Sequence, residues 1–181
     1  ELKNMIKEDF NSQQLALATH VAETLEKNLT VVKRELITLS LSPRIEYVEA
    51  VSWANRMKIS LSSISDYGTT EIMLIAPDGM NSYSINYANA IFIEQEDYTK
   101  EPYFQWCKKT ANKNKIYISK VTEGTVKDSE PGLVMKMAIP VYQVSSDEAH
   151  PVPTYNFGGV LVLTLDAGSL ASSLAAPIRS G

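Results

Sequence analysis

The feature that most constrains this fold is a pair of long apolar runs near the end of the chain, residues 133–142 and 158–166. The second run opens with two glycines, is rich in leucine and β-branched residues, and is too short to span a bilayer as a helix. Both runs are typical of central β-strands that are buried on two faces. The polar connection 143–157 is long enough to return the chain, so we predict an antiparallel pair.

A long amphipathic helix is predicted at the start of the chain, over residues 1–41. No proline or glycine occurs from Leu2 to Leu41, and apolar residues recur every three or four positions from Leu17 to Leu39. At about 1.5 Å per residue this helix is about 60 Å long, which exceeds what one core of this size covers. Its first ten residues are therefore expected to project, either as a free, frayed end or to pair with another chain as a homodimer.

Short helices and further strands are predicted between the long helix and the apolar runs. Ser42 caps and Pro43 begins short helices over residues 43–65. The other expected elements are a hairpin over 71–86 that turns at Pro77-Asp78-Gly79, a strand or lid within 87–100, a helix over 101–111 with Pro102 in its first turn, and a strand over 116–121. A C-terminal helix is expected over 167–176, leading to the membrane.

These elements predict an α+β fold in which a long N-terminal helix packs on an antiparallel, PAS-like sheet of about five strands, over residues 70–166. Alternation along the last strand separates its leucines from Val160, Val162 and Thr164. We expect the leucine face to pack on the long helix and the other face to look toward residues 98–106.

Composition favours one globular domain, residues 1–181, and excludes several classes of protein. The chain has 181 residues, of which 44% are hydrophobic, enough for one substantial core. A net charge of −4 without a basic stripe argues against nucleic acid. The single Cys107 and the widely separated His20 and His150 offer neither a disulfide nor a zinc motif, so no metal is expected. Because no phosphate-binding loop, nucleophile elbow or histidine dyad is present, we expect no cofactor and no catalytic residue.

Lys136 is the only charged residue in the first apolar run. A lysine buried in such a strand needs a carboxylate or an anionic ligand, whereas one at an edge reaches solvent and needs neither. Both interpretations stay open, and so does the choice between core and ligand contact for the aromatic residues nearby. The candidate ligand-binding residues are Tyr98, Tyr103, Trp106, Tyr117, Lys136, Ala138 and Thr164.

Three segments of the chain resemble the Cache family of extracytoplasmic sensor domains, which share a PAS-like core. They are Asp97 to Cys107, similar to the family's Tyr-x-x-Arg-Pro-Trp-Tyr segment, then Met137 to Tyr142, and finally Gly159 to Leu170. Together, in order, they span most of the chain between 72 and 170. The length fits a single-module domain rather than a tandem one. The chain begins with neither a Met start nor a signal peptide, so we expect a segment of a longer protein.

The resemblance implies a small-molecule sensor outside the cytoplasmic membrane of a prokaryotic cell, between two transmembrane helices that carry the signal. The transducer would be a histidine kinase or, alternatively, a chemoreceptor or a diguanylate cyclase. Two positions depart from the family. Glu101 stands where an arginine often binds a ligand carboxylate, and Thr164 where an acidic residue often holds a ligand amine. Lys136 could take over the carboxylate. Rival interpretations are a domain of the same fold that only dimerises or docks a partner protein, and a cytosolic PAS-type regulatory module.

Overall fold

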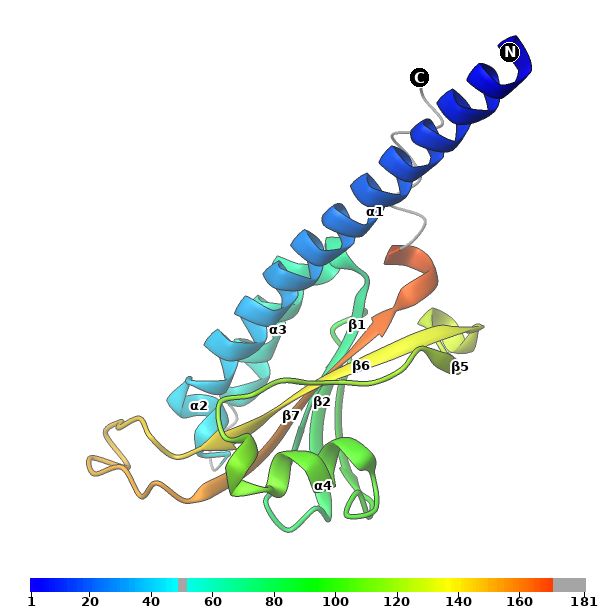
Figure 1. Cartoon of the computed structure of the whole chain (residues 1–181). Helices are drawn as coiled ribbons and strands as arrows, with labels where there is room; N and C mark the ends of the chain where they lie inside the picture. Colours follow the sequence, from blue (N-terminus) through cyan, green and yellow to red (C-terminus); the bar gives the residue numbers. More distant parts are fainter. Residues whose placement is uncertain (49–51, 171–181) are drawn as a thin grey trace.

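The computed structural model describes residues 1–48 and 52–170, in which helices flank a single antiparallel sheet (Figure 1). The helices are α1 (Leu2–Ser40), α2 (Pro43–Glu46), α3 (Ser52–Ile64) and α4 (Pro102–Lys108), with 3-10 turns η1 (Ser65–Tyr67), η2 (Thr110–Asn112) and η3 (Lys127–Ser129). The strands are β1 (Thr69–Ile75), β2 (Asn81–Asn86), β3 (Ile91–Gln95), β4 (Tyr117–Ile118), β5 (Thr122–Thr125), β6 (Pro131–Tyr142) and β7 (Phe157–Asp166).

The two apolar runs form β6 and β7, which pair antiparallel at the centre of the sheet, as predicted. The strand order is β3-β2-β1-β7-β6-β4, and β5 also pairs with β6. Each residue of β7 from Gly158 to Leu165 is buried. Gly159 has φ +118°, and a Cβ there would lie 2.1 Å from the carbonyl oxygen of Ile75. Only glycine therefore allows β1 to approach this end of β7 so closely.

The α+β class and the antiparallel sheet are confirmed, but the sheet has seven strands where about five were expected. The segment 87–100, left open as a strand or a lid, contains β3. In place of one strand over 116–121 there are two, β4 and β5. The reason is the length of β6, whose 12 residues exceed the reach of one short partner. β4 pairs with its middle and β5 with its beginning.

Each face of the sheet carries its own apolar cluster, divided as the alternation predicts. Leu161, Leu163 and Leu165 pack against α1 and α3, together with buried side chains such as Leu36 and Met57. On the other face Val160 and Val162 pack beneath α4 in a second cluster, whose members are Met73, Ile75, Tyr98, Tyr103, Phe104, Cys107, Ala138, Val160 and Val162. We call this second group the α4 cluster.

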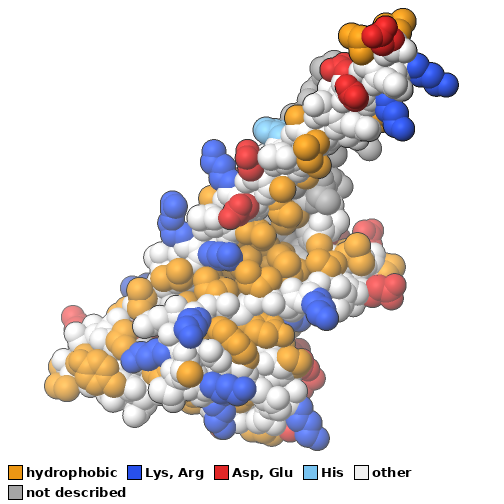
Figure 2. All heavy atoms as spheres, in the orientation of Figure 1, with side chains coloured by type: hydrophobic (Ala, Val, Ile, Leu, Met, Phe, Trp, Pro, Cys, Tyr) orange, Lys and Arg blue, Asp and Glu red, His pale blue; other side chains and the backbone are white. Residues whose placement is uncertain are grey.

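Only the C-terminal half of α1 belongs to the core. Residues 1–20 are exposed throughout, whereas Val32 and Leu36 are fully buried. The helix therefore projects from the body, as expected from its length (Figure 1). Figure 2 shows hydrophobic side chains gathered along the junction between α1 and the sheet. In the described ranges, no helix combines the length and apolar character needed to cross a membrane.

The end of β7 lies beside the body of α1 and runs toward the same end of the molecule as the projecting half of that helix (Figure 1). The amide of Asp166 donates to the carbonyl of Gly68 at 2.7 Å. Residues 167–170 are helical, and Leu170 is buried. The rest of the C-terminal helix predicted over 167–176 lies outside the described residues.

Candidate ligand-binding site

Four polar side chains form one row across the sheet, on the face that α4 partly covers. Strand pairing places Glu71 opposite both Asn86 and Thr164, and Thr164 opposite Lys136. Directly opposed residues share a face and lie about 5 Å apart, so an amide, a carboxylate, a hydroxyl and an ammonium group follow one another across β2, β1, β7 and β6. We call these four residues the polar row.

The polar row marks the limit of the α4 cluster. Two residues further along their strands, on the same face, Met73, Val162 and Ala138 are buried in that cluster. This face is therefore dry beneath α4 and polar beyond it. A ligand in contact with both parts would meet charged groups at one end and an apolar wall at the other.

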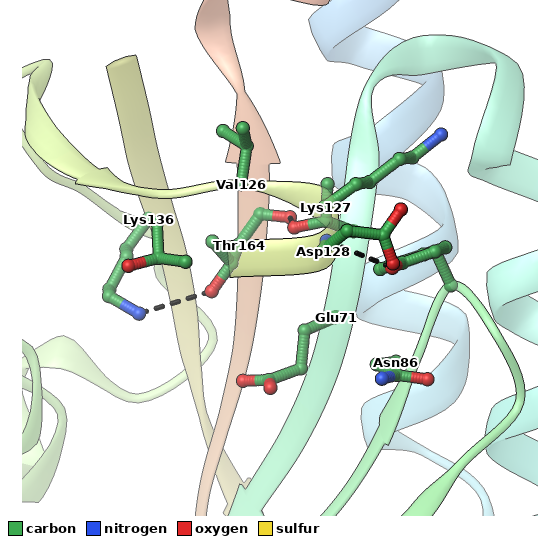
Figure 3. Close-up of a pocket in the computed structure, with 10 residues that line it drawn as sticks. Glu71, Asn86, Val126, Lys127, Asp128, Lys136 and Thr164 are labelled. Carbon is green, nitrogen blue, oxygen red and sulfur yellow. Dashed lines mark hydrogen bonds between the residues drawn. The ribbon is translucent and has the colours of Figure 1, made fainter. Parts of the chain in front are cut away.

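A cavity of about 370 Å³ opens over the polar row. Its walls are Thr70, Glu71, Asn86, Tyr87, Thr125, Val126, Lys127, Asp128, Lys136 and Thr164. Figure 3 shows residues 126–128 passing across the row at the level of Thr164, with Glu71 and Lys136 on either side of that threonine. The cavity thus lies between the polar row and the segment 122–130, which begins with β5 and which we call the flap.

The flap is held by the pairing of its β5 residues with β6 at one side and by a hydrogen-bonded clasp at the other. A Cβ at Gly124 would lie 2.5 Å from the Val134 side chain, so this glycine permits the close approach to β6. Across the cavity the Tyr87 hydroxyl donates to the Asp128 carboxylate and accepts from the Asp128 amide, the latter at 3.0 Å. Lys127 adds a cation–π contact, with Nζ 5.4 Å from the centre of the Tyr87 ring.

The carboxylate of Glu71 lacks a bonded partner among the residues that the structure describes. Burial raises its pKa above the ordinary value, the charge of Lys136 opposes this rise, and the charge of Glu94 adds to it. On the other side of the row the Lys136 ammonium donates to Thr164 Oγ1 at 3.1 Å. Because a desolvated carboxylate is costly without a donor, Glu71 is prepared to accept one from a ligand.

Asn86 and Thr70 complete the polar wall on the side of β1 and β2. The Oδ1 atom of Asn86 accepts the backbone amides of Ala88 and Ala90, which closes the turn between β2 and β3. Its amide nitrogen is the group left to offer to the cavity. Thr70 donates to the carbonyl of Thr164 at 3.2 Å, where the pairing of β1 with β7 shifts register.

The structure separates the seven predicted site residues into two groups. Lys136 and Thr164 line the cavity, in contact with each other. The others belong to the α4 cluster or pack against it: Tyr98, Tyr103 and Ala138 are buried, and the half-buried rings of Trp106 and Tyr117 lie 5.7 Å apart. A binding role for these five residues stays a prediction.

Eight of the ten cavity residues were not predicted, among them the five residues Glu71, Asn86, Tyr87, Lys127 and Asp128. Glu71 carried a usable signal, since it alternates with Met73 and Ile75 and is the only charge in β1. The other four lie in turns or at strand ends, where charged and polar residues are ordinary. In the described part of the chain, metal-ligating side chains form no group of three or more.

Comparisons with known proteins identify the fold by its geometry and not by its sequence. No protein-family model and no curated protein matches the sequence. The sensory domain of the Campylobacter jejuni chemoreceptor Tlp3 with isoleucine bound superposes with a TM-score of 0.65 at 13% identity, covering 96% of this chain and 65% of that one. The periplasmic sensory domain of the C. jejuni chemoreceptor Tlp1 gives 0.54 at 18% identity, covering 90% and 61%.

A third similar structure is the extracellular domain of a candidate histidine kinase, vpHK1S-Z8, with a TM-score of 0.52 at 15% identity and coverage of 93% and 63%. The present chain thus spans less than two thirds of each of these three domains. It has the fold of extracytoplasmic sensory domains, the fold that the Cache resemblance implied.

Proposed function

We propose that this chain is the extracytoplasmic ligand-sensing domain of a membrane signal transducer, and that it binds a small zwitterion over the polar row. One observation carries the proposal: the half-buried Glu71 carboxylate, which has no hydrogen-bond partner among the described residues, and the Lys136 ammonium flank Thr164 on the floor of one cavity. The domain itself is non-catalytic. Its parent protein is a histidine kinase or, alternatively, a chemoreceptor or a diguanylate cyclase.

The charges of the cavity favour a ligand that is neutral overall. Two acidic residues, Glu71 and Asp128, are balanced by two lysines, Lys127 and Lys136. A ligand ammonium group would take the position beside Glu71, and a ligand carboxylate the position beside Lys136. Glu71 and Lys136 would thus do the work of the family's acidic residue and arginine, whose positions are occupied in this chain by Thr164 and Glu101. The bound isoleucine of the Tlp3 structure offers a precedent of the same chemical class.

The fold also offers a route from the cavity to the chain ends. Thr164 lies on the cavity face of β7, and Leu163 and Leu165 on either side of it pack against the layer that contains α1. A ligand that shifts β7 would therefore change how that strand lies against the long helix. Such a ligand acts only through a difference in affinity between two arrangements, commonly about 1–3 kcal/mol.

The test is a thermal-shift screen of L-amino acids, amines, carboxylates and sugars, followed by calorimetry on the best hit with two variants and a control. Lys136→Met and Glu71→Gln should each weaken binding by roughly 10- to 100-fold, the range for a lost hydrogen bond to a charged group. Lys120→Met, at an exposed lysine outside the cavity, should bind as the parent does. A hit whose affinity neither site variant changes would refute the proposed site.

The second candidate function is that of a module of the same fold that dimerises or docks a protein without a small-molecule ligand. It is favoured by the projecting half of α1, on which Leu2, Ile6 and Phe10 are 70%, 62% and 58% exposed. A screen without hits, combined with dimerisation that Phe10→Glu abolishes, would support it over the sensor. Pairing through α1 stays a prediction.

A further inference from the structure

The strand β3 forms an edge of the sheet and exposes large apolar side chains on both of its faces. All five of its residues are exposed, and Ile91, Phe92 and Ile93 are 47%, 41% and 67% accessible. Ile91 and Ile93 lie opposite Ile85 and Tyr83, on the α3 face, while Phe92 points to the other face. Edge strands in soluble proteins are usually protected by charged side chains, proline or a bulge; β3 has a single charge, Glu94, and neither a proline nor a bulge.

The backbone groups along the outer side of β3 can be assigned from the pairing with β2. The amide of Asn86 donates to Ala90 and the amide of Glu96 donates to Met80, so even-numbered residues of this segment bond to β2. The N–H and C=O groups of Ile91 and Ile93 therefore point outward, away from the sheet. Among the apolar side chains of β3, those of Ile91 and Ile93 are also the most exposed.

We propose that β3 pairs with β3 of a second copy of this chain, in antiparallel register centred on Phe92. This register places each Ile91 opposite the Ile93 of the other copy, as hydrogen-bonded pairs with four backbone hydrogen bonds in total. The two Phe92 side chains meet at the centre as a non-hydrogen-bonded pair, where side chains lie closest. The two sheets become one continuous sheet across a twofold axis.

The partner of β3 is a second copy of the chain because the side chains of β3 complement one another in this register. Centring on Phe92 sets Ala90 opposite Glu94, so no two acidic residues face each other and every large apolar residue of β3 meets another. A register centred on Ile93 would instead set Phe92 against Glu94. Exposed Ile59 of α3 lies beside Asn89 at the start of β3 and extends the apolar surface on the α3 face.

Disulfide trapping of Phe92→Cys provides the first test. In the proposed register the two Cα atoms of residue 92 in neighbouring copies lie within the range that a disulfide can bridge. The native Cys107 is fully buried, and burial raises the pKa of its thiol to about 12, so it should stay unreactive. We expect the Phe92→Cys protein to form covalent dimers under mild oxidation. The matched control Ile118→Cys, on the opposite edge at β4, should stay monomeric.

The second test measures dimerisation by sedimentation equilibrium in the parent chain and in variants of Ile93. Ile93→Pro removes an outward N–H without affecting the ladder to β2, so the variant should fold normally and dimerise about 10-fold or more weakly. Ile93→Lys should weaken the dimer in the same way and is informative even if the proline variant is unstable. A chain that stays monomeric at every concentration would overturn the proposal, and so would a dimer lost in Phe10→Glu but retained in both Ile93 variants.

Discussion

Leu36 and Ile37 are neighbours on α1 that should respond very differently to truncation. Leu36 is fully buried among α1, α3 and the leucines of β7, whereas Ile37 is 42% exposed. A Leu→Ala change in an enclosed core costs about 2–5 kcal/mol, and the lack of room to collapse beneath a long helix favours the middle of that range. We expect Leu36→Ala to lower the free energy of unfolding by about 3 kcal/mol and Ile37→Ala by about 1 kcal/mol or less.

Urea denaturation followed by tryptophan fluorescence and circular dichroism measures both values, with an unchanged m-value as the check on two-state unfolding. For a domain of this size, about 3 kcal/mol corresponds to a fall in Tm of roughly 6–12 °C. Phe10→Ala, in the projecting half of α1, should leave stability within about 0.5 kcal/mol of the parent. Equal effects at Leu36 and Ile37 would show that α1 does not bury its Leu36 face against the sheet.

Three further predictions concern the cavity and the strand behind it. Because burial raises the pKa of Glu71, its negative charge opposes folding at pH values above that pKa. Glu71→Gln should therefore stabilise the ligand-free protein near neutral pH. This gain in stability should vanish once the pH falls below 4.5, the ordinary pKa of the group, as a pH series of urea titrations would show. Tyr87→Phe removes the clasp to Asp128, so hydrogen exchange in residues 122–130 should accelerate severalfold while global stability changes by less than about 1 kcal/mol. Gly159→Ala would force a Cβ against the carbonyl of Ile75 and should cost several kcal/mol, about 3 or more, in a thermal melt; a change below about 1 kcal/mol would contradict the described approach of β1 to β7.

The long helix and the two central strands were predictable because each carries its own periodicity in a local stretch of sequence. β4 and β5 were not predictable as a pair, because β4 has only two residues and β5 reads Thr-Glu-Gly-Thr, without apolar alternation. They are strands because β6 offers them hydrogen-bonding partners. β3 was likewise not predictable as a strand, because its apolar side chains are exposed, contrary to the usual pattern of a buried face.

The candidate site was only partly predictable because it is assembled by strand order. Lys136 and Thr164 were recognised as polar interruptions of apolar runs, and their pairing follows from the antiparallel arrangement of β6 and β7. Glu71 joins them only because β1 pairs with the other edge of β7, across more than 90 residues of sequence. The aromatic residues near α4 illustrate the opposite limit. Their spacing left the choice between core and ligand contact open. The structure buries Tyr98, Tyr103 and Phe104 and leaves Trp106 half-buried, outside the residues that line the cavity.

The most direct test of the account is a crystal structure of the chain with the strongest hit of the ligand screen. We expect the ligand to lie over Thr164, beneath the flap, with a cationic group within hydrogen-bonding distance of Glu71 and an anionic group within that distance of Lys136. Ligand density elsewhere, such as among the side chains beneath α4 or against α1, would contradict the proposed site.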